Sequence, residues 1–226
     1  MATIRKLMSR VAMLGRRLRE DRSGVALIEF AYSLPVMIPL TILGIESANL
    51  AIVNMRISQA AMMVADNAAR VRDRIDEADV NNIMLGAKLA GAGIDLLNKG
   101  RIVVATVEDN VATSGNTTDQ VVTWQRCKGV YSPSSTTTTQ GAILNGGVGK
   151  TGNKISPTVG NPIIFVEVYY QVQLLVPGMS SPVFGANPVL RYSSAFIIRD
   201  RNDQVMQNAS NLSGANLSSC SLFNAT

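Results

Sequence analysis

The chain contains no histidine among its 226 residues. Histidine is the commonest general base and the commonest metal ligand, so its absence excludes Ser-His-Asp and Cys-His catalysis and argues against a metal centre. Only two cysteines are present, which allows one disulfide and no tetrahedral zinc site. We therefore expect a protein that is not an enzyme and that carries no metal and no cofactor.

Net charge is also scarce outside the first 24 residues. Seven of the 21 basic residues and two of the 16 acidic residues lie in residues 1–24. That segment therefore carries the whole net charge of +5, and the rest of the chain is neutral. A protein that binds DNA or RNA carries its basic residues on the folded domain. We therefore expect no nucleic-acid partner.

A long apolar run follows the basic segment. Residues 25–45 contain a single charge, Glu29. As a helix this run is about 31 Å long, enough to cross the hydrocarbon core of a membrane, and Pro35 and Pro39 predict a kink or local unwinding within it. The basic residues upstream predict a cytoplasmic N-terminus and an extracytoplasmic remainder.

Glu29 is costly in hydrocarbon unless it has a function, and two interpretations remain open. In the first, the chain keeps its N-terminus as an uncleaved signal anchor, and Glu29 lies near the headgroups. In the second, a peptidase cuts between Gly24 and Val25, which makes Glu29 the fifth residue of the mature chain. Residues one and five share a helix face, so the carboxylate can pair with the new amine of its own chain or of a neighbour.

The stretch "GVALIEF" resembles the processing site of type IV pilin-like proteins, with glycine before the cut and glutamate fifth after it. The longer segment "GVALIEFAYSLPVMIPLTILGIESANLAIVNMRISQAAMMVADNAAR" is similar to the TadE-like pseudopilins, which are minor pilins of the tight-adherence (Tad/Flp) pilus system. The residues that carry this resemblance are Gly24, Glu29, Phe30, Ala31, Pro35, Gly44, Glu46 and the alanine-rich helix that ends at Arg70.

The resemblance implies a basic cytoplasmic leader over residues 1–24, a transmembrane pilin helix over 25–53 and an extracytoplasmic α+β domain over 54–226. It implies a single-pass protein of the bacterial inner membrane that a prepilin peptidase processes after Gly24. Its partners would be the pilin, other minor pilins and the inner-membrane assembly platform, and it would initiate, cap or regulate a pilus used for adherence. Glu29 and Phe30 would act in assembly, with Glu29 setting the register of subunits because an unpaired buried charge is costly.

A helical stripe continues beyond the apolar run, with Ile57, Ala61, Val64, Ala68, Val71 and Ile75 at steps of three and four. We expect Val71 and Ile75 to cover the core of the domain. For residues 57–68 the domain's own core and a partner helix in a filament are equally compatible with the pattern. A second helix, capped by Asp76 or Asp79, is expected to end at the Gly91 and Gly93 pair.

Four segments rich in β-branched residues then predict strands at residues 101–107, 120–127, 163–176 and 189–198. Four strands behind a long helix predict an α+β domain with an antiparallel sheet, and the resemblance implies that its arrangement is type IV pilin-like. Residues 128–162 are rich in Thr, Gly, Ser and Pro and predict a functional surface loop or a mobile one. The stretch "GGVGKTG" in this segment lacks the four-residue spacer between the first glycine and Gly-Lys-Thr that a phosphate-binding loop needs. We therefore expect no phosphate-binding loop here.

Cys127 and Cys220 are expected to form a disulfide if the domain lies outside the cytoplasm, either within one chain or between chains. Within one chain it would close about 94 residues and contribute about 4–5 kcal/mol. Two alternatives to a pilus protein remain: a signal-anchored periplasmic binding or scaffold module that uses loop 128–162, and a periplasmic hydrolase that relies on Glu167. The hydrolase is the weaker, because the sequence places no second carboxylate close to Glu167.

Overall fold

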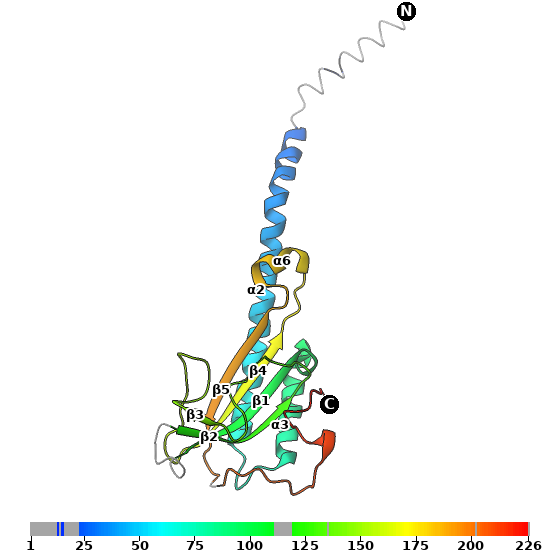
Figure 1. The fold of residues 1–226 in the computed structure, drawn as a ribbon. Coiled ribbons are helices and arrows are strands. Elements are labelled where there is room, and N and C mark those ends of the chain that lie inside the picture. Colours follow the sequence, from blue (N-terminus) through cyan, green and yellow to red (C-terminus); the bar gives the residue numbers. More distant parts are fainter. Residues whose placement is uncertain are drawn as a thin grey trace, which may run out of the picture.

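The structure is a computed structural model, and it describes residues 13, 15, 23–110, 119–134, 136–201 and 203–225. Most of the predicted leader, residues 1–24, lies outside the described residues. The described chain forms a long helix that projects from a domain of sheet, shorter helices and loops (Figure 1). This is the α+β arrangement that the sequence predicts.

Helix α2, Ser23–Ala69, is one continuous helix of 47 residues. At 1.5 Å per residue it is about 70 Å long. It passes through Pro35 and Pro39 without interruption, so the predicted unwinding there is wrong. Each proline removes one backbone hydrogen bond, and the bonds on either side are sufficient to keep the helix intact. Over residues 24–45 most side chains are exposed, whereas from Val53 onward one side of the helix is buried in the domain.

The sheet is antiparallel and has five strands in the order β3-β2-β1-β4-β5. Their bounds are Gly100–Asp109, Asp119–Lys128, Ile143–Asn145, Ile163–Gln171 and Val189–Ile197 for β1 to β5. The prediction of four strands misses β3, which lies within the supposed loop and pairs with the start of β2. Strand β4 is shorter than predicted, because the chain leaves the sheet after Gln171 and forms helix α6, Pro177–Phe184.

Helix α2 covers one face of the sheet together with helix α3, Glu77–Ala90. Ile57, Ala61, Val64 and Ala68 are at most 1% exposed and belong to a core cluster that also contains β1 and β4 residues. No partner helix can reach side chains that are buried in this way, so the stripe serves the domain's own core. Asp76 and Asp79 form a capping box at the start of α3, and Gly91 follows its last residue.

Residues 129–134 and 136–162 pack over the opposite face of the sheet, where Cys220 of the C-terminal tail also lies. Val148 is 1% exposed and packs with Phe165 of β4, and Tyr131 packs with Tyr169 beside the disulfide. Strands β1 and β4 are therefore buried on both faces, which explains why β1 reads as a nearly continuous apolar run. The segment predicted as a functional surface loop or a mobile one is a packed layer of the domain.

The glycines of "GGVGKTG" serve a tight turn in this layer. Val148 and Ile155 exchange two backbone hydrogen bonds of 2.8 Å. Gly147 has φ of +101°, and a Cβ atom there would lie 2.7 Å from the carbonyl oxygen of Ile155. Its N–H donates to Oε1 of Gln120 in β2 at 2.6 Å. Glycine is needed here for the close approach of two backbones and not for a phosphate group.

Candidate functional site

The predicted processing and assembly residues lie on the projecting half of α2. Val25 is 51% exposed, Phe30 is 64% exposed, and both Gly24 and Glu29 are exposed. Beyond its chain neighbours and the backbone of its own helix, no described atom lies within 4 Å of the position that a Cβ on Gly24 would take, so this glycine lies on an open helix surface. Val25 and Glu29 are four residues apart in one helix, and therefore lie on the same side.

Within the described part of the chain, no side chain pairs with Glu29. The surface around it is apolar: Leu27, Ile28, Phe30, Val36 and Leu40 are all more than half exposed. A helix that is apolar on all sides has to be covered by lipid or by other protein. In either environment a carboxylate needs a positively charged partner or hydrogen-bond donors. The described residues supply none, so the geometry directs Glu29 toward a group outside them.

Glu46 is a second carboxylate on α2 and has the opposite environment. It is 0% exposed, and its Oε2 accepts a hydrogen bond of 2.9 Å from the backbone N–H of Leu175. Its Oε1 accepts a weaker bond of 3.4 Å from the side-chain amide of Asn49. The sequence singles out Glu46 only through the resemblance. Its tie to a residue 129 positions away has no local signal.

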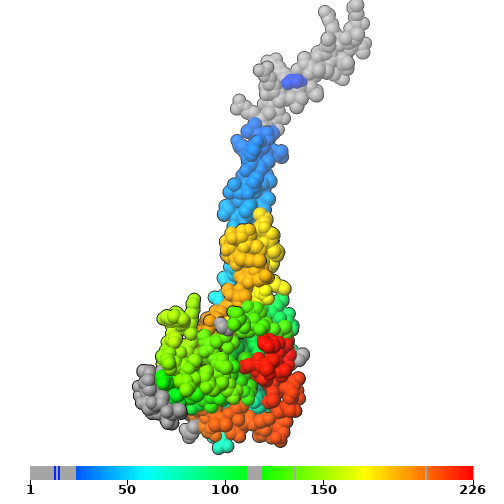
Figure 2. Space-filling view, in the orientation of Figure 1, coloured from blue at the N-terminus to red at the C-terminus, as the bar shows by residue number. Residues whose placement is uncertain are grey.

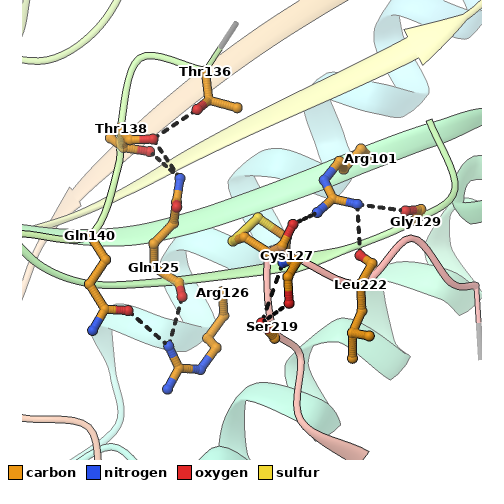
Figure 3. Close-up of a disulfide and its surroundings, with 12 residues drawn as sticks. Arg101, Gln125, Arg126, Cys127, Gly129, Thr136, Thr138, Gln140, Ser219 and Leu222 are labelled. Carbon is orange, nitrogen blue, oxygen red and sulfur yellow. Dashed lines mark hydrogen bonds between the residues drawn. A yellow bond between two sulfur atoms is a disulfide. The ribbon is translucent and has the colours of Figure 1, made fainter. Parts of the chain in front are cut away.

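The cysteine pair forms the predicted disulfide, and it forms within one chain. Figure 3 shows this bridge beside Arg101, whose guanidinium group points at the C-terminal tail. Arg101 donates to the carbonyl oxygens of Gly129 at 2.9 Å, Leu222 at 3.0 Å and Cys220 at 2.6 Å. The guanidinium also lies 4.1 Å from the centre of the Phe223 ring. The tail is thus attached to the sheet by the disulfide and by Arg101, in addition to backbone hydrogen bonds such as that from the Cys127 N–H to the Ser218 carbonyl at 2.7 Å.

Arg101 is 2% exposed, and burial lowers its pKa below the ordinary value. Sequence reasoning missed its role, although an arginine at the start of an otherwise apolar strand is a usable signal. A buried cation needs several acceptors, and here backbone carbonyls supply them instead of a carboxylate.

Glu167 lies on the loop-covered face of β4 and is 0% exposed. It forms an ion pair with Arg191 of β5, and it accepts hydrogen bonds from the Thr137 backbone and from the Tyr169 hydroxyl. Burial, and then the Glu167 charge, raise the pKa of Tyr169 well above its usual value. Every contact of this carboxylate is internal, so Glu167 has no access to a substrate and serves as a structural ion pair.

The described residues contain no group of three His, Cys, Asp or Glu side chains that could hold a metal ion. A surface hollow of about 530 Å³ lies between α4, Leu96–Lys99, and the α6 region. Lys99 is the single titratable residue in its lining. The hollow therefore brings together no acid and base pair.

The comparisons with known proteins add no relative. No protein-family model, no curated protein and no solved structure matches this chain.

Proposed function

We propose that the protein is a membrane-anchored pseudopilin of the TadE-like type, which acts in assembly of a Tad/Flp pilus. The observation that carries the proposal is Glu29. This exposed carboxylate has no partner among the described residues, and it lies about one helical turn after the exposed Gly24–Val25 pair. Helix α2 is long and apolar enough to cross a membrane, which supports a single-pass protein with its domain outside the inner membrane.

The division of α2 supports a role in assembly. Its C-terminal half is fixed in the domain core, while its N-terminal half projects beyond the sheet (Figure 1) and has many exposed apolar side chains. Subunits that leave the membrane exchange lipid for the same apolar surface of neighbours. A cut after Gly24 creates an amine on Val25. This amine can pair with Glu29 of a neighbouring subunit, and only one axial offset between the two subunits leaves neither charge unpaired. The pair sets the register and is not a large source of stability.

The partners of this proposal are the prepilin peptidase, the pilin and other minor pilins, and the inner-membrane assembly platform. The protein initiates, caps or regulates the pilus, and it needs no cofactor and no nucleic acid. The competing binding module would use loop 128–162 to bind its ligand. These residues pack over the sheet, which weakens that alternative.

The first experiment is the mass of the N-terminal peptide from membrane-isolated protein. We expect a peptide that begins at Val25, and we expect it to disappear when the prepilin peptidase is deleted. A Gly24→Leu variant should accumulate as the full-length chain. A native peptide that begins at Met1 or Ala2 would contradict the proposal and would make Glu29 an interfacial residue of a plain anchor.

A pair of substitutions then tests assembly apart from processing. Glu29→Gln removes the charge and keeps the size, so we expect normal membrane insertion and loss of surface pili. Ser33→Ala, one turn further along α2, is the matched control, because the Ser33 hydroxyl bonds only to the Phe30 carbonyl of its own helix. Normal piliation in both variants would refute the assigned role of Glu29.

A further inference from the structure

An uncharged hairpin lies beside the membrane-spanning part of α2. It comprises residues 172–188 and contains α6. No charged residue occurs between Glu167 and Arg191. The exposed fractions are 58% for Leu175, 38% for Val176 and 61% for Val183. Exposed apolar side chains that cluster on one element mark a binding surface for protein or lipid.

The hairpin is separated from the body of the domain and held against α2. Figures 1 and 2 show it further along the helix toward the N-terminus than the sheet. Helix α2 contacts α6, and the Leu175 N–H donates to the Glu46 carboxylate at 2.9 Å. Between residues 35 and 46, the covered positions of α2 are Pro39, Ile42, Leu43 and Glu46. Their spacing of three, one and three places them on one face of the helix.

This covered face fixes the depth of the hairpin relative to the apolar span. The apolar run ends at Ile45, and the partly covered face of α2 on which Glu46 meets the hairpin starts at Pro39. Six residues of helix correspond to about 9 Å along the axis. Elements that lie in a membrane interface enter the headgroup and acyl boundary to about 5–10 Å. With α2 across the bilayer, the hairpin therefore reaches the lipid.

The hairpin also has a low cost of removal from water. Its three prolines, Pro177, Pro182 and Pro188, have no N–H group to satisfy. The Ser180 hydroxyl bonds to the Val176 carbonyl at 2.6 Å, and the Val172 N–H bonds to the Pro188 carbonyl at 2.9 Å. A segment that has no charge and part of its backbone paired loses less when it enters the interface than a charged segment does.

We propose that residues 172–188 form a membrane-interface hairpin, which inserts Leu175, Val176 and Val183 into the outer leaflet beside α2. The lipid surface is the occupant of this apolar patch. The hairpin fixes the position of α2 along the bilayer normal, and it keeps Glu46 covered at the membrane boundary. The inference rests on the membrane anchoring in the proposed function and does not depend on pilus assembly.

The test is quenching of tryptophan fluorescence by lipid. The full chain is reconstituted into vesicles of phosphatidylcholine and phosphatidylglycerol, with or without bromine on the upper acyl chain of the phosphatidylcholine. The native Trp124 is 1% exposed in the domain core and gives a constant, unquenched background. Val183→Trp places a probe on the hairpin, and Leu175→Trp provides a second position there. Both sites are more than half exposed, so the fold accommodates the larger ring.

Two control variants place the probe outside the membrane and within the span. Val159→Trp replaces a valine of similar exposure, 56%, in the layer over the sheet. Tyr32→Trp places the probe on the exposed surface of the span, where the native side chain is 80% exposed. We expect bromination to remove on the order of half of the fluorescence that Val183→Trp adds, as for a group at the interface. Bromination should remove none of the fluorescence that Val159→Trp adds.

The outcomes separate this inference from the anchoring on which it rests. Quenching of Tyr32→Trp without quenching of either hairpin probe would overturn the hairpin and leave the anchor intact. A second copy of the chain seated on the patch would give that same result. Equal quenching of Val159→Trp and Val183→Trp would also overturn it, because the whole domain would then lie on the membrane. Absence of quenching in Tyr32→Trp would refute the anchoring itself.

Discussion

Arg101→Met should destabilise the domain strongly, although residue 101 touches no ligand. The substitution keeps most of the aliphatic volume and removes the cation that holds the tail. Three hydrogen bonds to carbonyl oxygens are lost. Bonds to charged groups contribute about 1.5–3 kcal/mol each. The cost of burying the cation, seen in its lowered pKa, offsets part of this sum. We expect a net loss of about 3–5 kcal/mol, as for other broken buried networks.

The assay is thermal unfolding of the full chain in detergent, followed by the fluorescence of Trp124, the only tryptophan. For a domain of this size the loss corresponds to a fall in Tm of about 6–20 °C. Arg101→Lys should recover a part of the stability, because an ammonium group reaches fewer of the three carbonyls. Arg70→Met is the matched control: its side chain is 68% exposed and pairs only with Asp66 one turn away.

The tail is also held by the disulfide, so the two attachments should be coupled. In a chain with both cysteines replaced by serine, Arg101→Met should cost less than in the native chain, because the tail is already loosened. A change in Tm of less than about 2 °C for Arg101→Met in the native background corresponds to under about 1 kcal/mol. That result would refute the reasoning.

Three further predictions concern the same domain. Reduction of the disulfide should lower the stability by about 4–5 kcal/mol in the chain-entropy model, measured as the difference in denaturant midpoint with and without dithiothreitol. Glu108→Gln should raise the Tm near pH 7 and lose this advantage below about pH 4. Burial raises the pKa of Glu108, so ionisation opposes folding, and the native chain loses stability as the pH rises through that pKa. An advantage that is equal at both pH values would contradict this. Glu167→Gln should cost about 3–5 kcal/mol in denaturant unfolding, because it leaves Arg191 without its buried partner. Unchanged stability would show that the pair contributes nothing.

The elements were predictable from the sequence where local spacing defines them. The steps of three and four from Ile57 to Ala68 identify the buried side of α2, because a helix repeats every 3.6 residues. The capping residue Asp76 and the terminating Gly91 bond to residues close to them in sequence, so both ends of α3 can be predicted from a few consecutive residues. The candidate site is local in the same sense, since Gly24 and Glu29 lie within two turns of one helix.

The remaining features depend on contacts between distant segments, which local spacing does not encode. Residues 128–162 have a loop-like composition, and only their packing against Phe165 and Tyr169 makes them a layer of the domain. Strand β3 has three residues and exists because β2 offers an unpaired edge.

The charged residues show the same division between what the sequence determines and what the tertiary structure determines. The sequence by itself determined that Glu29 is a carboxylate in an apolar helix. Only the tertiary structure decided that Glu46 is covered while Glu29 is open, because the hairpin that covers Glu46 joins α2 through a bond across 129 residues. Arg101 likewise gains its role from a tail about 120 residues away, whose carbonyls meet it only after the sheet has formed. Periodicity and composition fix what each segment can bury, and the assembled sheet fixes which distant segment covers it.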